Sequence, residues 1–232
     1  MIYRITRKEL SLLMMFSNVK MLSGYEDIQI LDNRPDALEC LKSLTEKGYL
    51  EKNPEDKYSI DEKLEAWIIS VSKPYGYMIM ENASESGGRK TVIYFKRDSI
   101  VVLTNKGDEY ELMWLPALPF AIGHIANEIN IFKNTETVHI GKYSMNEFEN
   151  NEEKIIGTQY QPEYMFYVFE CGTMTGSISV YVSKNEQLML CFEEDKVSVL
   201  KPQKSEYINT ITRLMAPIHA NAIKEVKNNV RL

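Results

Sequence analysis

One pattern occurs twice in this chain: an apolar and aromatic run ending in Glu, a small polar loop containing Gly, and an alternating run. Residues 75–95 read YGYMIMENASESGGRKTVIYF, and the stretch from Tyr164 to Val182 reads YMFYVFECGTMTGSISVYV. Residue 77 aligns with residue 166, a shift of 89. Alternation and turn chemistry also make unrelated antiparallel hairpins look alike. The order of elements that follows each copy favours two related halves.

Four strands are predicted in each copy because apolar residues alternate there with a period of two. They lie near residues 75–81, 90–96, 99–104 and 109–114, and again near 164–170, 176–182, 187–192 and 195–200. Gly, Asn and Asp in the first connections suit hairpins. Each set is followed by a predicted helix, at about 118–131 and 205–228. Pro217 lies inside the second helix and predicts a kink or two shorter helices.

The same shift aligns the apolar positions of the two helices. It places Ile122, Ile125 and Ile129 on Ile211, Leu214 and Ile218.

Three helices are predicted before the first meander. Thr6 and Glu9 form a capping box that starts a helix over residues 7–17. Asp32 or Asn33 is the cap of a second helix that has Pro35 in its first turn and ends at Gly48. Two short strands around an Asn-Pro turn come next.

A third helix is expected after Ser59 and Glu62, which have capping-box spacing, and it stops at Pro74. Its apolar stripe includes Trp67, which we expect to be largely buried against the first sheet. After residue 131 the chain is polar and predicted to be irregular. Ser144 and Glu147 cap an acidic segment that reads as a loop or a poorly packed helix.

These elements predict an α+β fold: a quasi-two-fold body of two four-stranded antiparallel meanders, each followed by a helix, with an N-terminal helical segment. A sheet with one apolar face needs a cover, and no Pro/Gly/Ser-rich linker separates the halves. We therefore expect a single domain over residues 1–232, with an N-terminal half (1–131) and a C-terminal half (132–232).

Composition and motifs exclude several classes of function. The net charge of −6 and the pI near 5.3 argue against nucleic acid or an anionic membrane as the main partner. No apolar stretch is long enough to span a bilayer. An odd number of cysteines without a C-x-x-C pattern favours the cytoplasm, with Cys171 and Cys191 as small buried hydrophobes. No nucleophile elbow, phosphate loop or metal-ligand spacing occurs, so no enzyme, metal or cofactor is expected.

His124 and Glu128 share a helix face, but two ligands do not make a metal site.

A binding surface for another protein is the remaining possibility. The chain contains twelve Met, fourteen Tyr and eight Phe, and Met-rich surfaces adapt to varied apolar partners. Most of these side chains are expected in the core. The first candidate is Met174, at the tip of an uncharged hairpin. Further candidates lie on the closing helix and in the run MWLPALPF, which is either a buried crossover or an exposed contact patch. These residues are Leu214, Met215, Ile218, Trp114 and Leu115.

The order of elements resembles a known family. The opening ITRKELSLL, the stretch RPDALECLKSLTEKGYL and the recurring unit of meander plus helix resemble the EspG-like chaperones of type VII secretion and related proteins of Gram-positive bacteria. The resemblance implies a cytosolic chaperone or adaptor. It would bind the apolar tip of a helical secretion substrate, keep it soluble and deliver it for export, without catalysis or a cofactor. The oligomeric state and the substrate's identity stay open.

A winged helix is the alternative interpretation of the N-terminal residues, because ALECLKSLTEKGYLEKNPEDKYSI also reads as a helix, a short strand and a wing. A DNA-binding regulator would need basic residues there. Lys42 and Lys47 are offset by Asp36, Glu39 and Glu46, so the field that attracts phosphate is missing. Retention of DNA at low salt would distinguish this regulator from a chaperone.

Overall fold

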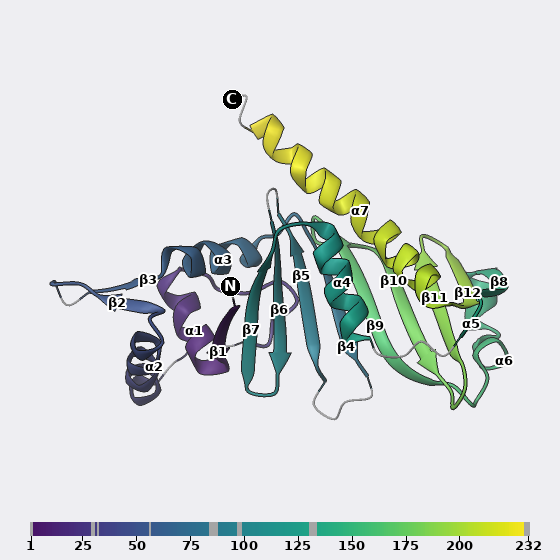
Figure 1. Ribbon diagram of the computed structural model, residues 1–232, viewed down its shortest axis with the longest axis horizontal. Helices are drawn as coiled ribbons and strands as arrows, with labels where there is room; N and C mark the ends of the chain where they lie inside the picture. The colour runs from purple at the N-terminus through teal and green to yellow at the C-terminus, as the bar shows by residue number, and fades with distance from the viewer. Residues whose placement is uncertain are drawn as a thin grey trace.

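The computed structural model describes residues 2–28, 31, 33–55, 57–83, 88–96, 99–129 and 134–229. Its centre is one ten-stranded antiparallel sheet (Figure 1). In spatial order the strands are β1 (Ile2–Thr6), β7 (Glu109–Leu115), β6 (Ile100–Lys106), β5 (Lys90–Phe95), β4 (Gly76–Asn82), β9 (Gln161–Glu170), β10 (Thr173–Val182), β11 (Gln187–Glu193), β12 (Lys196–Lys201) and β8 (Val138–Ser144).

Helices cover both faces of this sheet. The remaining elements are α1 (Arg7–Phe16), α2 (Arg34–Glu46), the hairpin β2 (Leu50–Lys52) and β3 (Tyr58–Ile60), α3 (Glu62–Ser72), α4 (Leu118–Glu128), α5 (Met145–Glu149), α6 (Glu152–Ile156) and α7 (Lys204–Asn229). One face carries α4 and α7 (Figure 1). The other face carries α1 and α3 near β1, and α5 and α6 near β8.

The predicted α+β fold with two four-stranded meanders is confirmed. Strands β4 to β7 pair consecutively, as do β9 to β12, and β4 pairs with β9 to join the two sets edge to edge. Gly76 pairs with Glu170 and Glu81 with Met165. The shift of 89 exchanges these two pairs, so the central strand pair has the expected two-fold register.

The shift of 89 residues does not relate the two meanders beyond the central pair of β4 and β9. Strand β4 ends at Asn82 and β5 begins at Lys90, whereas only Cys171 and Gly172 separate β9 from β10. Because these connections differ in length, the second strands of the two meanders align at another offset.

Local signals at the helix starts account for most of the helix boundaries. The capping box at Thr6 is present: its N–H donates to the Glu9 carboxylate at 2.7 Å. The box at Ser144 and the Asn33 cap of α2 also form. Helix α3 is capped by Asp61 and not by Ser59, because Ser59 lies in β3 and the Asp61 carboxylate accepts the Leu64 N–H at 2.9 Å.

Two edge strands were not predicted. Strand β1 is short and pairs with β7, about a hundred residues further along the chain. Strand β8 lies in the stretch predicted to be irregular and pairs with β12. The acidic segment forms α5 and α6, which pack Phe148 and Ile156 into a core cluster with β11 and β12.

Two further expectations concern Trp67 and Pro217. Trp67 is intermediate in exposure and packs against the core cluster, with its ring edge-on to that of Tyr3 and the centroids 5.2 Å apart. Helix α7 is one continuous helix that contains Pro217, so of the two expected outcomes, a kink or two shorter helices, the second does not occur. It lies so close to the sheet that a Cβ at Gly76 would collide with the side chain of Ile218.

Candidate partner-binding surface

A cross-strand row of residues brings the predicted site residues to one end of the sheet. Successive pairings join Leu115 to Ile100, Phe95, Gly76 and Glu170, and Glu170 pairs with Thr173. Met174 follows directly, and Trp114 precedes Leu115. The segments that contain Leu115, Phe95 and Met174 therefore lie at the same end of their strands, although they are far apart in sequence. Helix α7 leaves the sheet at this end (Figure 1).

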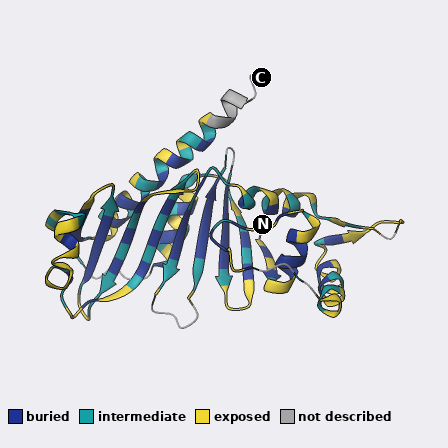
Figure 2. Ribbon diagram, turned by 180° about the vertical axis from the view of Figure 1, so that it is seen from behind, coloured by how far each residue is buried: buried dark blue, intermediate teal, exposed yellow. Residues whose placement is uncertain are grey.

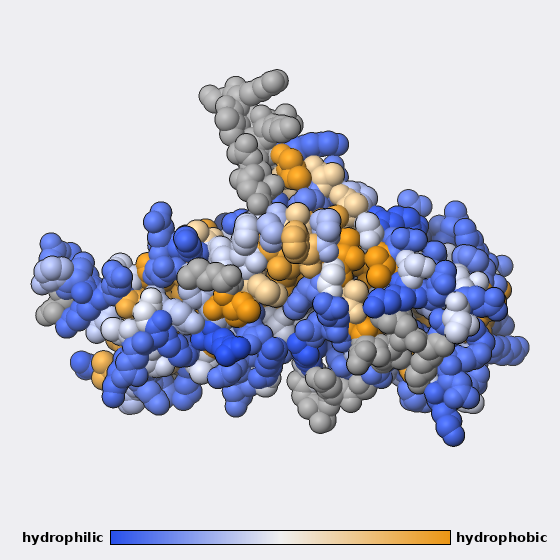
Figure 3. Space-filling model, viewed as in Figure 1, coloured by the Kyte–Doolittle hydropathy of each residue, from blue (hydrophilic) through white to orange (hydrophobic). Residues whose placement is uncertain are grey.

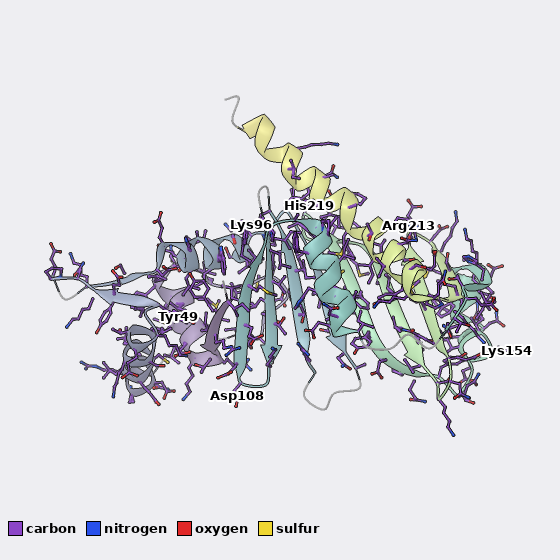
Figure 4. All side chains as sticks on the ribbon, viewed as in Figure 1. Tyr49, Lys96, Asp108, Lys154, Arg213 and His219 are labelled. Atoms are coloured by element: carbon purple, nitrogen blue, oxygen red, sulfur yellow. The ribbon has the colours of Figure 1, made fainter. Side chains whose placement is uncertain are left out.

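A groove of about 1140 Å³ opens at this end, and we call it the α3–α7 groove. Its lining residues are Ser17, Asn18, Val19, Lys20, Met21, Ala66, Ile69, Ser70, Ser72, Lys73, Pro74, Tyr75, Phe95, Lys96 and Ala222. Figure 4 labels Lys96, one of the lining residues, and His219, which lies on α7. A space of this size exceeds the usual range for small-molecule pockets, about 300–1,000 Å³.

The turn after α1 forms one wall of the groove. Asn18 adopts a left-handed conformation with φ of 52°, which Asn tolerates better than most residues. The Val19 N–H then donates to the Met14 carbonyl at 2.8 Å, which closes the helix end. Val19 is consequently buried, whereas Met21 stands 53% exposed at the rim.

The last turns of α3 form a second wall. Ile69 is 49% exposed, whereas its neighbour Ile68 is buried. Ser70 and Ser72 donate their hydroxyls to carbonyls of their own helix, at 2.6 Å each. Lys73 and Pro74 then end the helix.

The hairpin between β9 and β10 lies next to the groove. The Cys171 N–H donates to the carbonyl of Tyr75, a lining residue, at 2.8 Å, and the Tyr75 hydroxyl donates to Glu170 at 2.8 Å. Met174 is 54% exposed, and Cys171 is exposed in a left-handed turn rather than buried as expected. This hairpin therefore places an exposed methionine on a segment that is hydrogen-bonded to a wall of the groove.

A strip of aromatic side chains continues from Met174 across the face of the sheet opposite α4 and α7. Met174 pairs with Phe169, whose ring stacks on Tyr77 at 4.7 Å. Phe169, Tyr77 and Tyr167 are half-buried. Figure 2 views this face, where buried and intermediate residues alternate along β4, β9 and β10 between the two groups of covering helices.

The closing helix contributes less than the sequence predicts. Met215 and Ile218 are buried, at 0% and 2% exposure, in the core between α7 and the sheet, so their side chains face the sheet and not a partner. Leu214 is half-buried. The sheet formed by joining the two meanders edge to edge covers Met215 and Ile218 fully and Leu214 in part.

The run MWLPALPF is exposed in part. Trp114 is 39% exposed and Leu115 half-buried, whereas Phe120 on α4 is 58% exposed. Figure 3 shows apolar residues gathered on the face that carries α4 and α7. Phe120 was not among the predicted site residues; its signal was its place in an uncharged, Pro-containing run.

Two titratable groups away from the groove are buried or paired. Burial lowers the pKa of His124, and Glu128 is held by Arg89 at 2.5 Å. Burial, together with a hydrogen bond to Glu193, raises the pKa of the Cys191 thiol to about 12. Within the described ranges no cluster of three or more His, Cys, Asp or Glu side chains is placed to hold a metal ion.

Four lysines of the N-terminal segment are paired with acidic neighbours. The ion pairs are Lys8–Asp36, Lys42–Glu46, Lys47–Glu9 and Lys57–Glu55. A surface arranged in this way gives phosphate little attraction. In the part of the chain that the structure describes, no helix has both the length and the apolarity needed to cross a membrane.

The comparisons with known proteins identify a fold. No family model matches the sequence, and no curated protein matches it. Among solved structures, the chain is similar to the type VII secretion system chaperone EspG5 of Mycobacterium tuberculosis, solved in complex with the PE25–PPE41 dimer. The similarity covers 93% of this chain and 96% of EspG5, with a TM-score of 0.69 and 8% sequence identity. The chain therefore has an EspG5-like fold over nearly its whole length.

Proposed function

We propose that this chain is a cytoplasmic chaperone or adaptor of type VII secretion. It binds the apolar tip of a helical substrate, keeps that substrate soluble and delivers it for export. The observation that carries the proposal is the fold shared over nearly the whole chain with EspG5, a chaperone solved with the PE25–PPE41 dimer. The protein acts by binding alone.

The exposed apolar side chains at one end of the sheet support this function. Met174, Met21 and Ile69 are each about half-exposed; Met21 and Ile69 line the α3–α7 groove, and Met174 lies on the hairpin that is hydrogen-bonded to the lining residue Tyr75. A helix binds in such a groove with its apolar face inward. A soluble monomer gains nothing from exposing such side chains together, whereas a chaperone needs them.

Co-purification tests the proposal. The protein is expressed together with the small helical proteins encoded beside it, and we expect one of them to be retained on the tagged chain. Met174→Asp should leave the melting temperature unchanged because the side chain is exposed. It should weaken capture, because binding would bury a carboxylate without a partner.

Val138→Asp is the matched control. Val138 is 44% exposed on β8, an outermost strand of the sheet that β11 and β12 separate from β10, so the same change of charge there should leave capture intact. Equal capture by folded Met174→Asp and wild-type protein would remove the hairpin from the site. Failure of wild-type protein to retain any such neighbour would exclude the chaperone function.

A further inference from the structure

The α3–α7 groove combines an apolar floor with a basic rim. Val19, Phe95 and Ala222 are buried in its floor. Lys20 and Lys73 are exposed at its edge, and Lys96 also belongs to the lining. Among the residues that the structure describes, none that lines the groove is acidic. The whole protein has a net charge of −6, so the rim of the groove is a positively charged region on a negatively charged molecule.

The two exposed lysines are available to a partner. Within the described ranges of the chain, Lys20 and Lys73 have no ion pair, unlike the lysines of α1, α2 and the β2–β3 hairpin. Glu170 is an acidic side chain that contacts a lining residue, Tyr75. Its carboxylate already accepts hydrogen bonds from Tyr75 at 2.8 Å and Asn221 at 3.0 Å.

We propose that the groove binds an acidic amphipathic helix of the partner, with its apolar stripe on the floor and its carboxylates beside Lys20 and Lys73. This inference rests on the proposed function and specifies the chemistry of the substrate. An α-helix is about 10 Å wide, and complementary charge at the rim favours the correct partner and speeds its encounter.

Charge also argues against occupation by this chain's own C-terminal residues. That segment carries Lys224, Lys227 and Arg231, which would place positive charge beside the positive rim. The other acidic occupant to consider is the segment of α5 and α6 from a second copy of this chain. Measuring the oligomeric state tests that alternative.

The experiment uses two synthetic amphipathic peptides of about 20 residues, long enough to form a helix. Both carry Leu at positions i, i+3, i+4 and i+7 of each repeat; one has Glu and the other Lys on the polar face. Binding to the full-length protein is measured by fluorescence anisotropy at low salt. The wild-type protein should bind the Glu peptide more tightly, and added salt should reduce the difference.

Charge reversal at the rim is the decisive perturbation. Lys20→Glu combined with Lys73→Glu should weaken binding of the Glu peptide about tenfold, because each change replaces an attraction with a repulsion. Lys154→Glu is the matched control, since Lys154 is exposed at the far end of the molecule (Figure 4). It should change the affinity less than twofold. Thermal melts verify that the variants are folded.

Three results would overturn the assignment. The first is equal affinity of the wild-type protein for both peptides. The second is a double-reversal variant that binds the Glu peptide as tightly as the Lys154→Glu control does. The third is a dimer of the wild-type protein that the double reversal dissociates.

If wild-type protein captures its helical neighbour and the reversals have no effect on capture or peptide binding, the groove assignment fails while the chaperone function stands. If it captures no neighbour but binds the Glu peptide through these lysines, the chaperone function fails and the chemistry of the groove stands.

Discussion

Glu9 ties the first two helices together, and its removal should destabilise the protein measurably. The side chain is almost fully buried, at 2% exposure. Its carboxylate accepts hydrogen bonds from the Lys47 ammonium at 2.7 and 2.8 Å, the Ser43 hydroxyl at 2.6 Å and the Thr6 N–H at 2.7 Å. Glu9→Gln retains the shape of the side chain and removes its charge.

The expected loss follows from these contacts. A hydrogen bond to a charged group contributes about 1.5–3 kcal/mol, and removing one partner of a buried ion pair costs about 3–5 kcal/mol. The Lys47 side chain is 34% exposed, so water partly replaces the lost carboxylate. We therefore expect the free energy of unfolding to fall by about 2–3 kcal/mol for Glu9→Gln.

Urea unfolding at pH 7 measures this loss, and a double-mutant cycle with Lys47→Met isolates the ion pair. A loss below about 1 kcal/mol, or strict additivity of the two changes, would refute the reasoning.

The pH dependence has a defined sign. Burial raises the pKa of Glu9, but hydrogen bonds from Lys47, Ser43 and Thr6 outweigh it, so the net pKa is lowered. The stabilisation is present above the ordinary Glu pKa of about 4.3 and is lost as the pH falls through the lower folded value. The difference between wild-type and variant should shrink accordingly in acid.

Three further outcomes follow from the packing and from thiol exposure. Gly76→Ala should cost about 1–3 kcal/mol, because the new methyl would collide with Ile218; an unchanged urea midpoint would show that α7 is not seated so closely. Trp67→Ala should cost about 2 kcal/mol, below the usual range for a buried Trp, since the ring is half-buried; a loss above about 4 kcal/mol would contradict that exposure. A thiol reagent should label Cys171 alone in the folded protein and all three cysteines after denaturation, because Cys40 and Cys191 are buried; rapid labelling of Cys191 would contradict its environment.

The meanders and helix starts were predictable because their signals are local. Period-two alternation extends over each strand, and a cap such as Thr6 with Glu9 fixes where a helix begins. Strand β1 was missed because its five residues merge with the α1 start signal and gain their partner only through long-range pairing with β7. Strand β8 was missed because an edge strand with mostly exposed side chains lacks an apolar pattern.

The surface was less predictable than the fold. Periodicity assigned Met215 and Ile218 to an apolar stripe but did not reveal how much of the stripe the sheet covers. Met174 was identifiable because a methionine beside glycines in a hairpin has few neighbours. The α3–α7 groove had no sequence signal, since its walls come from segments around residues 17–21, 66–75, 95–96 and 222.

The pairing of β4 with β9 has a consequence for any fragment of this protein. A chain ending after α4 would expose β4 as an edge with a row of unpaired N–H and C=O groups. Because the native register is two-fold, the same strand can pair with a second β4, placing Gly76 opposite Glu81. The isolated N-terminal half is therefore expected to self-associate into a symmetric dimer, in which a copy of the half takes the place of its missing counterpart.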